Sequence, residues 1–426
     1  MDKPKQIILL VVGGIIILAI LIFTGILPGL RKDLGQGEIE LEIWGFEDDE
    51  DILKDILTRY SEEIEPRIKV KYLKKDFKTY KQDLINALAA GKSLDIFSLK
   101  NTWIEEHKDK LLPLPEGEVD FTTSDFRRTF IDSVQSGLVI DGKIAGLPLF
   151  ADNLALFYNK DHFNAAGLAS PPQNWDDTVA FAKKLTKYSS GGDIERSGLA
   201  LGSYANVAHS FEIISALFLQ SGDKIIDRES GEISLSAKNA GNAIAFFTSF
   251  SNPKKNAYFW NGRLPNSLDA FAQNKASMAL GLAEDAETIK LKNPRLNFGI
   301  APLPQIVNSD RKSTYSSYVF KAVSKMSENS VEAWKLLLYL SNKENSKQYI
   351  ELTRRPPARR DLISSVPNSL GAFYAQALYS EDWPVPEETA VLEIFKDVIE
   401  SIETGKTSTD FAVEQLSLQL NLLLKR

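Results

Sequence analysis

The sequence contains no cysteine, and this absence removes several kinds of chemistry at once. A chain without thiols has no disulfides, no thiolate metal ligands, no cysteine nucleophile and no lipid-bearing cysteine of the kind that anchors lipoproteins. Histidine is nearly as scarce, because the 426 residues include only His107, His162 and His209, which are scattered. With neither thiols nor an H-E-x-x-H motif, we expect no metal site and no cofactor.

An excess of positive charge is also lacking. Fifty Lys and Arg residues are outnumbered by 57 Asp and Glu residues, which gives a net charge of −7 at pH 7. Nucleic-acid binding relies on a basic surface that neutralises phosphates, so we expect no nucleic-acid partner. Hydrophobic residues make up 43% of the chain and charged residues 25%, and this balance is typical of a globular protein. The length allows about two domains or more.

Familiar nucleotide-binding and hydrolase motifs are missing as well. The stretch "AAGKSLDI" resembles the end of a phosphate-binding loop, but the first glycine of that motif would fall at Asn86. No G-x-S-x-G nucleophile elbow is present.

Arginines cluster in "TRRPPARRD" (353–361), which suits either a solvated basic turn or a contact with an anionic partner or domain.

A long uncharged run lies near the N-terminus. Residues 7–27 carry no charged side chain, and the run is about as long as the roughly 20 residues that cross a bilayer. Cleavable signals have a shorter apolar region and a small-residue cleavage site. We therefore expect a cytoplasmic stub and single-pass transmembrane anchor at 1–32, a tether at 33–37, and an extracytoplasmic remainder held at the cell membrane. A cleaved signal is the alternative.

Hydrophobic periodicity after the tether predicts alternating strands and helices. Strand patterns at 38–46, 67–75 and 94–99 are separated by helical patterns at 47–64 and 78–91. This order predicts a doubly wound α/β sheet, whose ligands lie beyond the carboxyl ends of the strands. Further helices are predicted at 171–186 (with Asn174 as N-cap), 212–223 and 238–250, a strand within 295–305, and a mostly helical C-terminal part.

A polar pair interrupts a strand-like stretch, "GLPLFADNLALFYNKDHF" (146–163), where Asp152 and Asn153 separate two apolar runs. Extended over 146–186, this stretch resembles bacterial extracellular solute-binding proteins, family 1, the group that includes maltose-binding protein. Residues 260–282, 296–305 and 354–362 resemble later stretches of the family in the same order. The resemblance covers nearly the whole chain after about residue 38.

The resemblance implies an α/β, two-lobe, periplasmic-binding-protein-like fold of type II with hinge strands between the lobes. We expect the chain to cross between lobes near 150–154, 300–305 and 354–358. Lobe 1 would comprise 38–151 plus 305–353, and lobe 2 would comprise 154–300 plus 358–426. Asp152 and Asn153 would lie on the floor of the cleft, although Asp152 could instead cap a neighbouring loop.

The resemblance also implies which residues face a bound solute. The matching positions are Asp152 with Asn153 on the hinge; Phe46, Glu47 and Asp48 after the first strand; Trp103 after the third strand; Tyr204, Trp260, Asn261 and Glu284 from the second lobe; and, more weakly, Tyr315 and Trp383. For Trp383 we favour a structural role. Aromatic rings stack on sugar faces and carboxylates accept hydrogen bonds from hydroxyls, so the set favours a carbohydrate. A polyamine-type cation is the alternative.

The implied function is that of a monomer that captures a carbohydrate outside the cell and delivers it to the permease of an ABC importer, without catalysis. A sensor-coupled binding protein that serves a membrane receptor is one competing hypothesis. An anchored glycoside hydrolase is another, and it would need two carboxyl groups roughly 5–10 Å apart around one bond. Spacing along the sequence does not test that distance.

Overall fold

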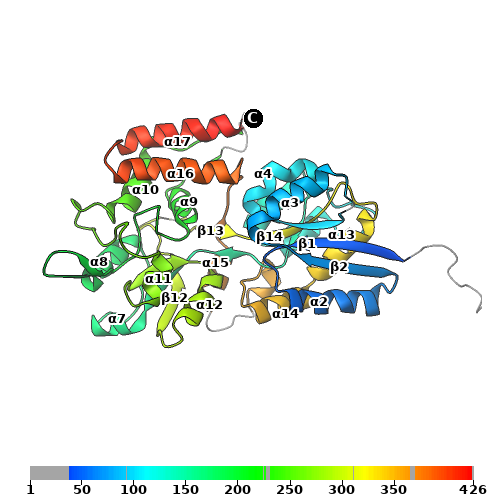
Figure 1. The fold of residues 1–426 in the computed structure, drawn as a ribbon, viewed down its shortest axis with the longest axis horizontal. Helices are drawn as coiled ribbons and strands as arrows, with labels where there is room; N and C mark the ends of the chain where they lie inside the picture. The colour runs from blue at the N-terminus through cyan, green and yellow to red at the C-terminus, as the bar shows by residue number, and fades with distance from the viewer. Residues whose placement is uncertain are drawn as a thin grey trace, which may run out of the picture.

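The structure, a computed structural model, describes residues 38–92, 94–223, 225–226, 231–309, 311–364 and 370–424. The expected anchor (1–32) and tether (33–37) lie outside these residues. Across the described ranges, no helix is both long enough and apolar enough to cross a membrane. The chain forms two lobes that lie side by side, joined by short strands near the middle of the molecule (Figure 1).

Lobe 1 is built on a five-stranded sheet in the order β2-β1-β3-β14-β6. Strand β1 (Ile39–Gly45) pairs in parallel with β2 (Ile68–Lys74) and β3 (Ile96–Lys100). Antiparallel β14 (Val319–Val323) lies between β3 and β6 (Leu147–Pro148). The predicted strand–helix alternation is confirmed, since α2 (Glu50–Arg59) and α3 (Phe77–Ala89) connect the three parallel strands on opposite sides of the sheet (Figure 1).

Helix α2 begins three residues later than the sequence predicts, and the reason is its cap. The carboxylate of Asp49 accepts a hydrogen bond from the backbone N–H of Ile52 at 3.2 Å, which satisfies a donor of the first turn. Glu50 and Asp51 then occupy the first turn, where the helix dipole favours negative charge. Glu47 and Asp48 are left in the loop that follows β1.

Lobe 2 contains a three-stranded antiparallel sheet in the order β11-β8-β12. Its central strand β8 (Ala155–Asn159) lies between β11 (Met278–Gly281) and β12 (Phe298–Pro302), which confirms the strand predicted within 295–305. Helix α8 (Trp175–Leu185) begins after Asn174, whose side chain accepts from the N–H of Asp177 at 2.8 Å, so the predicted N-cap is confirmed.

The other helices and strands complete the two lobes. In lobe 1 they are α4 (Ile104–His107), α5 (Thr123–Thr129), α6 (Asp132–Leu138), β4 (Val139–Ile140), β5 (Lys143–Ile144), α13 (Ser330–Leu340) and α14 (Lys343–Thr353). In lobe 2 they are α7 (Lys160–Ala165), β9 (Lys187–Tyr188), β10 (Ile194–Arg196), α9 (Ser210–Gln220), α10 (Ala237–Ser249), α11 (Ser267–Ala272), α12 (Ala283–Lys292), α16 (Glu388–Glu403) and α17 (Thr409–Leu424). Helix α15 (Gly371–Ala377) lies between the lobes (Figure 1).

The first crossing between lobes lies where the sequence predicts it. Strand β7 (Asp152–Asn153) pairs antiparallel with β13 (Thr314–Ser317), and β13 pairs in parallel with β15 (Ser380–Glu381). Ala151 is buried in the core of lobe 1, and Leu154 is buried in the core of lobe 2. The polar pair therefore occupies the short strand that connects two separate hydrophobic cores.

The other two crossings lie later than we expected. Leu303 and Tyr315 are still buried in the core of lobe 2, so the chain returns to lobe 1 at 316–317 and not at 300–305. The third change of core lies between Leu362, in lobe 1, and Leu370, in lobe 2, and not at 354–358. Both shifts have one cause, which is that apolar residues after each predicted boundary still pack into the core of the lobe that precedes it. Leu303 packs into lobe 2, and Leu362 packs into lobe 1.

Candidate functional site

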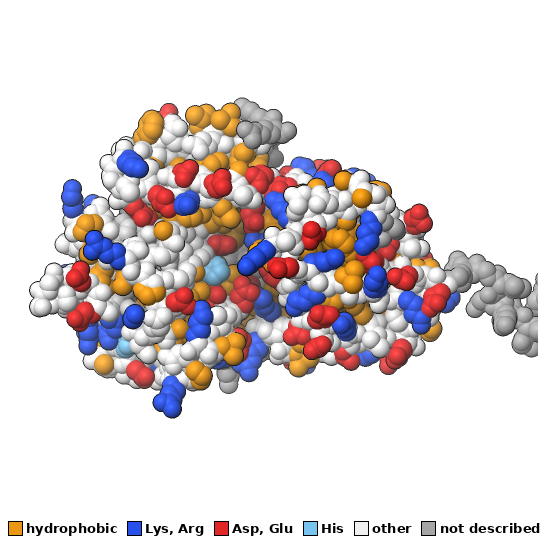
Figure 2. Space-filling model, in the orientation of Figure 1, with side chains coloured by type: hydrophobic (Ala, Val, Ile, Leu, Met, Phe, Trp, Pro, Cys, Tyr) orange, Lys and Arg blue, Asp and Glu red, His pale blue; other side chains and the backbone are white. Residues whose placement is uncertain are grey.

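A cavity of about 240 Å³ lies between the lobes at the hinge strands. Figure 2 shows acidic and basic side chains and a histidine gathered where the two lobes meet. The lining residues are Glu47, Phe77, Lys100, Phe150, Tyr318, Val319 and Arg355 from lobe 1; His209, Glu212, Leu282 and Glu284 from lobe 2; and Asp152 and Ser317 from the connecting strands. Of the predicted site residues, the structure thus brings Glu47, Asp152 and Glu284 together.

The fold explains why the lobe 1 side of the cavity is polar. Glu47 follows β1, and Lys100 is the last residue of β3, so both lie at the carboxyl ends of parallel strands. In open α/β sheets this edge is where ligands bind, because the loops leaving the strands diverge there. The late start of α2 leaves Glu47 free of the helix.

Asp152 lies on the floor of the cavity, but the protein already uses its carboxylate. The side chain is 1% exposed. Its two oxygens lie 2.9 and 3.0 Å from the backbone nitrogen of Ala283, which donates as the first residue of α12, and Oδ1 also accepts from the N–H of Asn153 at 2.8 Å. These contacts favour the capping role that the sequence left open, since Asp152 ties the start of a lobe 2 helix to the hinge.

Arg355 connects the acidic residues of the cavity. Its guanidinium lies 3.4 Å from Asp152 and 2.6 Å from Glu284, and it stacks 4.7 Å from the centre of the Phe150 ring. The arginine-rich segment therefore includes a residue that contacts acidic side chains from the hinge and from lobe 2. This outcome matches the second of the two readings that the sequence allowed for "TRRPPARRD".

Glu47 and Glu212 differ from the other charged residues around the cavity. Lys100 is 2.6 Å from Glu388, and His209 Nε2 is 2.8 Å from Asp285 Oδ2. Among the interactions between described residues, no hydrogen bond or ion pair involves the side chain of Glu47 or Glu212. These two carboxylates, one from each lobe, are therefore acceptors available to a molecule in the cavity.

The surroundings shift the pKa of Glu47, Asp152 and His209, among other groups in the cavity. Glu47 still contacts water, but desolvation by the two lobes and the negative charge of Glu284 raise its pKa to about 7. Burial raises the pKa of Asp152 to about 6, against the opposing effect of Arg355. Burial alone would lower the pKa of His209, but its bond to Asp285 outweighs this and raises the pKa to about 9. Near neutral pH, Glu47 can therefore both accept and donate a proton.

The aromatic surface of the cavity comes from Phe77 instead of the predicted Trp103. Phe77 is 49% exposed and lines the cavity. Trp103 is 3% exposed, lies stacked at 6.0 Å from Phe77, and donates its indole N–H to Glu388 at 2.5 Å. The predicted Phe46 is also buried, 5.4 Å from both rings. Phe46 and Trp103 thus support Phe77 from behind.

Asp48 and Asn153, which we expected to face the solute, are buried and paired inside the protein. Asp48 is buried in an ion pair with Lys321 at 2.6 Å and accepts from the hydroxyl of Tyr72 at 3.0 Å. Asn153 is buried on the hinge, where its amide donates to the carbonyl of Phe373 at 3.0 Å and accepts from Gln376 at 3.1 Å. Their polar atoms are occupied because both side chains lie inside the protein.

Four aromatic or amide residues predicted from lobe 2 and the hinge also lie away from the cavity lining. Trp260 has no exposed surface and donates to Asn206 at 2.8 Å, and Tyr315 is buried beside Phe211. Asn261 bonds to Tyr258 within its own loop, and the hydroxyl of Tyr204 donates to the carbonyl of Leu392 in α16. Large aromatic side chains usually fill cores, and here that general tendency prevails. The structural role favoured for Trp383 agrees with its burial and its bond to Ser215.

Little in the sequence marks the basic and aromatic lining. Lys100 is a polar residue at the end of a buried strand, which is a usable signal, and Arg355 lies in an arginine cluster whose partner the sequence does not name. His209 is an isolated histidine, and its left-handed φ of 57°, which is uncommon outside glycine, is visible only in the structure. Phe77 and Glu212 carry no local signal, because each belongs to an ordinary amphipathic helix pattern.

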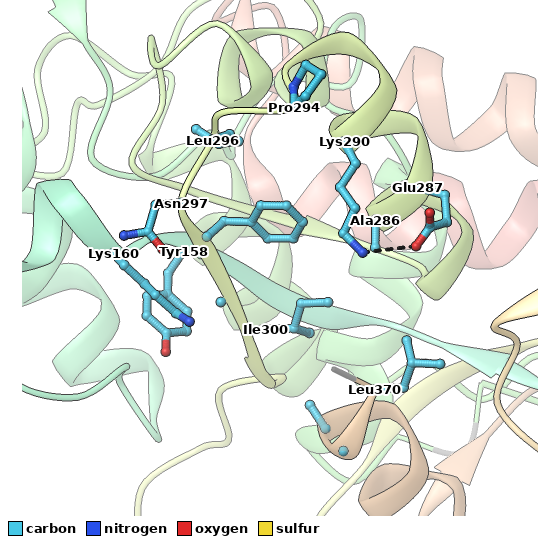
Figure 3. Close-up of a pocket in the computed structure, with 14 residues that line it drawn as sticks. Tyr158, Lys160, Ala286, Glu287, Lys290, Pro294, Leu296, Asn297, Ile300 and Leu370 are labelled. Carbon is cyan, nitrogen blue, oxygen red and sulfur yellow. Dashed lines mark hydrogen bonds and ion pairs between the residues drawn. The ribbon is translucent and has the colours of Figure 1, made fainter. Parts of the chain in front are cut away.

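A larger cavity of about 440 Å³ lies on lobe 2 alone. Figure 3 shows its wall, formed by Tyr158 and Lys160, by Glu287 and Lys290 of α12, and by Ile300 of β12. Glu287 and Lys290 pair with each other at 3.0 Å. Because only one lobe lines this cavity, movement between lobes would not enclose a molecule there. We therefore place the candidate site in the smaller, interlobe cavity.

Within the described residues, no cluster of three or more His, Asp or Glu side chains could hold a metal ion.

Comparison with known proteins gives a consistent picture. A family model for bacterial extracellular solute-binding proteins matches residues 56–370. A putative binding protein of Brucella abortus is 26% identical over 356 residues, which cover 81% of this chain and 83% of the relative. A galactooligosaccharide-binding protein of Bacillus subtilis is 24% identical over 388 residues, which cover 88% and 87%.

Solved structures show the same fold. The sugar-binding protein MalE from Xanthomonas citri superposes with a TM-score of 0.77 at 20% identity, and the match covers 91% of this chain and 97% of that chain. A cyclo/maltodextrin-binding protein complexed with maltotetraose gives a TM-score of 0.74 at 20% identity over 91% and 98%. The two-lobe α/β architecture implied by the resemblance is confirmed.

Proposed function

Because the chain belongs to the family of bacterial extracellular solute-binding proteins, we propose that it captures a carbohydrate between its two lobes and delivers it to the permease of an ABC importer. The observation that carries this proposal is the cavity lined by both lobes and by the hinge. A molecule that contacts both walls favours the closed arrangement of a hinged protein, because it binds that arrangement more tightly.

The chemistry of the lining supports a carbohydrate. The exposed ring of Phe77 offers a flat apolar surface, and the unpaired carboxylates of Glu47 and Glu212 accept hydrogen bonds from hydroxyl groups. Glu284 and Arg355 complete a polar rim. We assign these side chains as solute contacts and Asp152 as a residue that positions α12 and Arg355. Relatives that bind galactooligosaccharides and maltodextrin support the same class.

A thermal-shift screen of the full chain tests the proposal. The panel contains mono-, di- and oligosaccharides, with putrescine and spermidine as the cationic alternative. A ligand at 100 times its dissociation constant adds about 2.7 kcal/mol to the free energy of unfolding, which raises the melting temperature by several degrees. A shift with a sugar supports the proposal, and a shift with polyamines alone would replace the carbohydrate with a cation.

We further propose that the protein binds without catalysis. Its family consists of binding proteins, and Asp152, one of the acids in the cavity, is committed to a helix N-terminus. Incubation of a bound oligosaccharide followed by chromatography should return it intact. Sustained product formation that is lost in Glu47→Gln would establish a hydrolase instead.

We propose that the uncharged run at 7–27 holds the protein at the membrane with the lobes outside the cytoplasm. The length and lack of charge of the run support an anchor, and the family supports an extracytoplasmic location. After expression in a bacterium, the protein should stay in the membrane fraction through a carbonate wash. A soluble mature protein that starts beyond residue 28 would identify a cleaved signal.

A further inference from the structure

Glu388, the first residue of α16, reaches from lobe 2 to a segment of lobe 1. Its Oε1 accepts hydrogen bonds from Lys100 Nζ and from the hydroxyl of Thr102, both at 2.6 Å, and its Oε2 accepts from the indole N–H of Trp103 at 2.5 Å. Three donors from one short segment, residues 100–103 at the end of β3, thus converge on one carboxylate of the opposite lobe.

A second acidic side chain makes the reverse connection. Oε1 of Glu106, in lobe 1, accepts a hydrogen bond from the backbone N–H of Glu388 at 3.0 Å. The first N–H groups of a helix have no partner within the helix and carry partial positive charge, so a carboxylate there is stabilising. Glu106 is itself held by Lys81 at 2.6 Å. Each lobe therefore offers an acidic group to donors of the other.

These contacts join elements that belong to different cores. Trp103 is buried in the core of lobe 1, whereas Val391 and Phe395 of α16 are buried in the core of lobe 2. The contact is largely shielded from water, since the side chains of Lys100 and Glu388 are 21% and 14% exposed. Burial opposes ionisation of Glu388, but Lys100 and the neighbouring donors outweigh it and lower the pKa. The carboxylate is therefore ionised at neutral pH.

We propose that Glu388 and Glu106, neither of which lines the cavity, form an interlobe clasp that holds the two lobes together. The clasp ends on Lys100, which lines the cavity, and on Trp103, which supports Phe77. It therefore sets the position of one cavity wall at the same time as it holds the lobes together. This inference concerns the contact between lobes, and it stands whether or not the solute is a sugar.

Distance measurement between spin labels tests the clasp without any solute. Because the chain has no cysteine, Lys78→Cys on α3 and Lys396→Cys on α16 provide two unique labelling sites, both exposed. Double electron–electron resonance on the full chain in detergent then reports the separation of the lobes. We expect a single short distance for the parent and a shift to longer, broader distances after Glu388→Gln. Glutamine replaces one of the two acceptor oxygens with an NH₂ donor, which cannot accept a hydrogen bond from the three donors of lobe 1.

Two further variants separate the clasp from general damage to α16. Glu393→Gln changes an exposed glutamate on the same helix and should leave the distances as in the parent. Thr102→Val removes one donor from the lobe 1 side and should shift the distances in the same direction as Glu388→Gln. Identical distributions for the parent, Glu388→Gln and Thr102→Val would overturn the proposal, as would an equal shift in Glu393→Gln.

Loss of folding does not obscure the result, because circular dichroism is recorded on each labelled sample. If Glu388→Gln does not fold, Thr102→Val alone decides, since valine keeps the shape of threonine. The failure of this proposal is distinguishable from failure of the proposed function: a sugar can still raise the melting temperature of a protein whose lobes are not clasped.

Discussion

At the scale of single residues, Glu47 and Asp152 are two acidic side chains of one cavity with different roles. Glu47 has no protein partner among the described residues, whereas both oxygens of Asp152 accept from the start of α12. The difference arises from position, because Glu47 lies in a loop and Asp152 in a buried hinge strand. No sequence motif distinguishes these two roles, but the effects of mutation on sugar binding and on stability should.

We predict that Glu47→Gln weakens sugar binding without loss of stability. A hydrogen bond to a charged acceptor contributes about 1.5–3 kcal/mol, so the dissociation constant should rise roughly tenfold to 150-fold. Calorimetry at pH 8, above the pKa of about 7, measures the ionised form. Urea unfolding at pH 8 should show a stability equal to or above that of the parent, because the raised pKa means that ionised Glu47 opposes folding and glutamine removes this charge. Unchanged affinity would remove Glu47 from the site.

For Asp152→Ala we predict a loss of stability. The variant leaves the N–H of Ala283 without its acceptor and deprives Arg355 of one of two acidic partners. Breaking a buried ion pair costs about 3–5 kcal/mol, and the remaining contact with Glu284 should reduce this to about 2–4 kcal/mol. Urea unfolding gives the value. A stable variant with weakened sugar binding would instead make Asp152 a direct solute contact.

His209 should make stability depend on pH on the alkaline side. Its pKa is raised from 6.5 to about 9 in the folded protein, so its stabilising effect is complete below pH 6.5 and is lost as pH rises through 9. One pKa unit corresponds to about 1.4 kcal/mol, which sets an upper bound of about 3 kcal/mol. In His209→Asn, a residue that tolerates the left-handed backbone, urea unfolding between pH 6.5 and 9 should show a flatter profile. An equal slope in both proteins would contradict this.

At the scale of secondary structure, the end of β1 is the element that the site depends on most. A Cβ atom on Gly45 would lie 2.3 Å from Asp48 Oδ2 and 2.6 Å from the hydroxyl of Tyr72. Gly45→Ala must therefore displace Asp48 from Lys321, and we predict a loss of about 2–4 kcal/mol in urea unfolding. Gly262→Ala, where a Cβ meets no atom within 4 Å, is the matched control. Equal stability of the two variants would contradict the packing described for β1.

Helices and strands were easier to predict from the sequence than the long-range contacts between them. The strand β1 was predicted from the alternation of apolar and polar residues, and the start of α8 was predicted from the cap at Asn174. Both signals are local, and both predictions are confirmed. The return to lobe 1 at 316–317 depends on how β12 pairs with β8, which is a long-range contact that local periodicity does not contain. Of the residues predicted from the resemblance, Glu47 and Glu284 line the cavity. Trp260 lies in the core of lobe 2, since a tryptophan suits a core as well as a ligand.

At the scale of the whole molecule, two hydrophobic cores are connected by short strands, and the cavity lies at the connection. Asn153 and Gln376 bond to each other at 3.1 Å where β7 meets α15, so the hinge has its own buried polar network. On each side, the walls belong to separate hydrophobic cores. This arrangement allows a molecule in the cavity to be enclosed by relative movement of the lobes.

The position of a bound sugar tests the central claim most directly. A crystal structure of the full chain with the sugar that gives the largest thermal shift should show it between the lobes, in contact with Glu47 and Phe77 from one side and with Glu212 or Glu284 from the other. A sugar bound in the lobe 2 cavity beside Tyr158 and Ile300, or at any place that only one lobe contacts, would contradict the account.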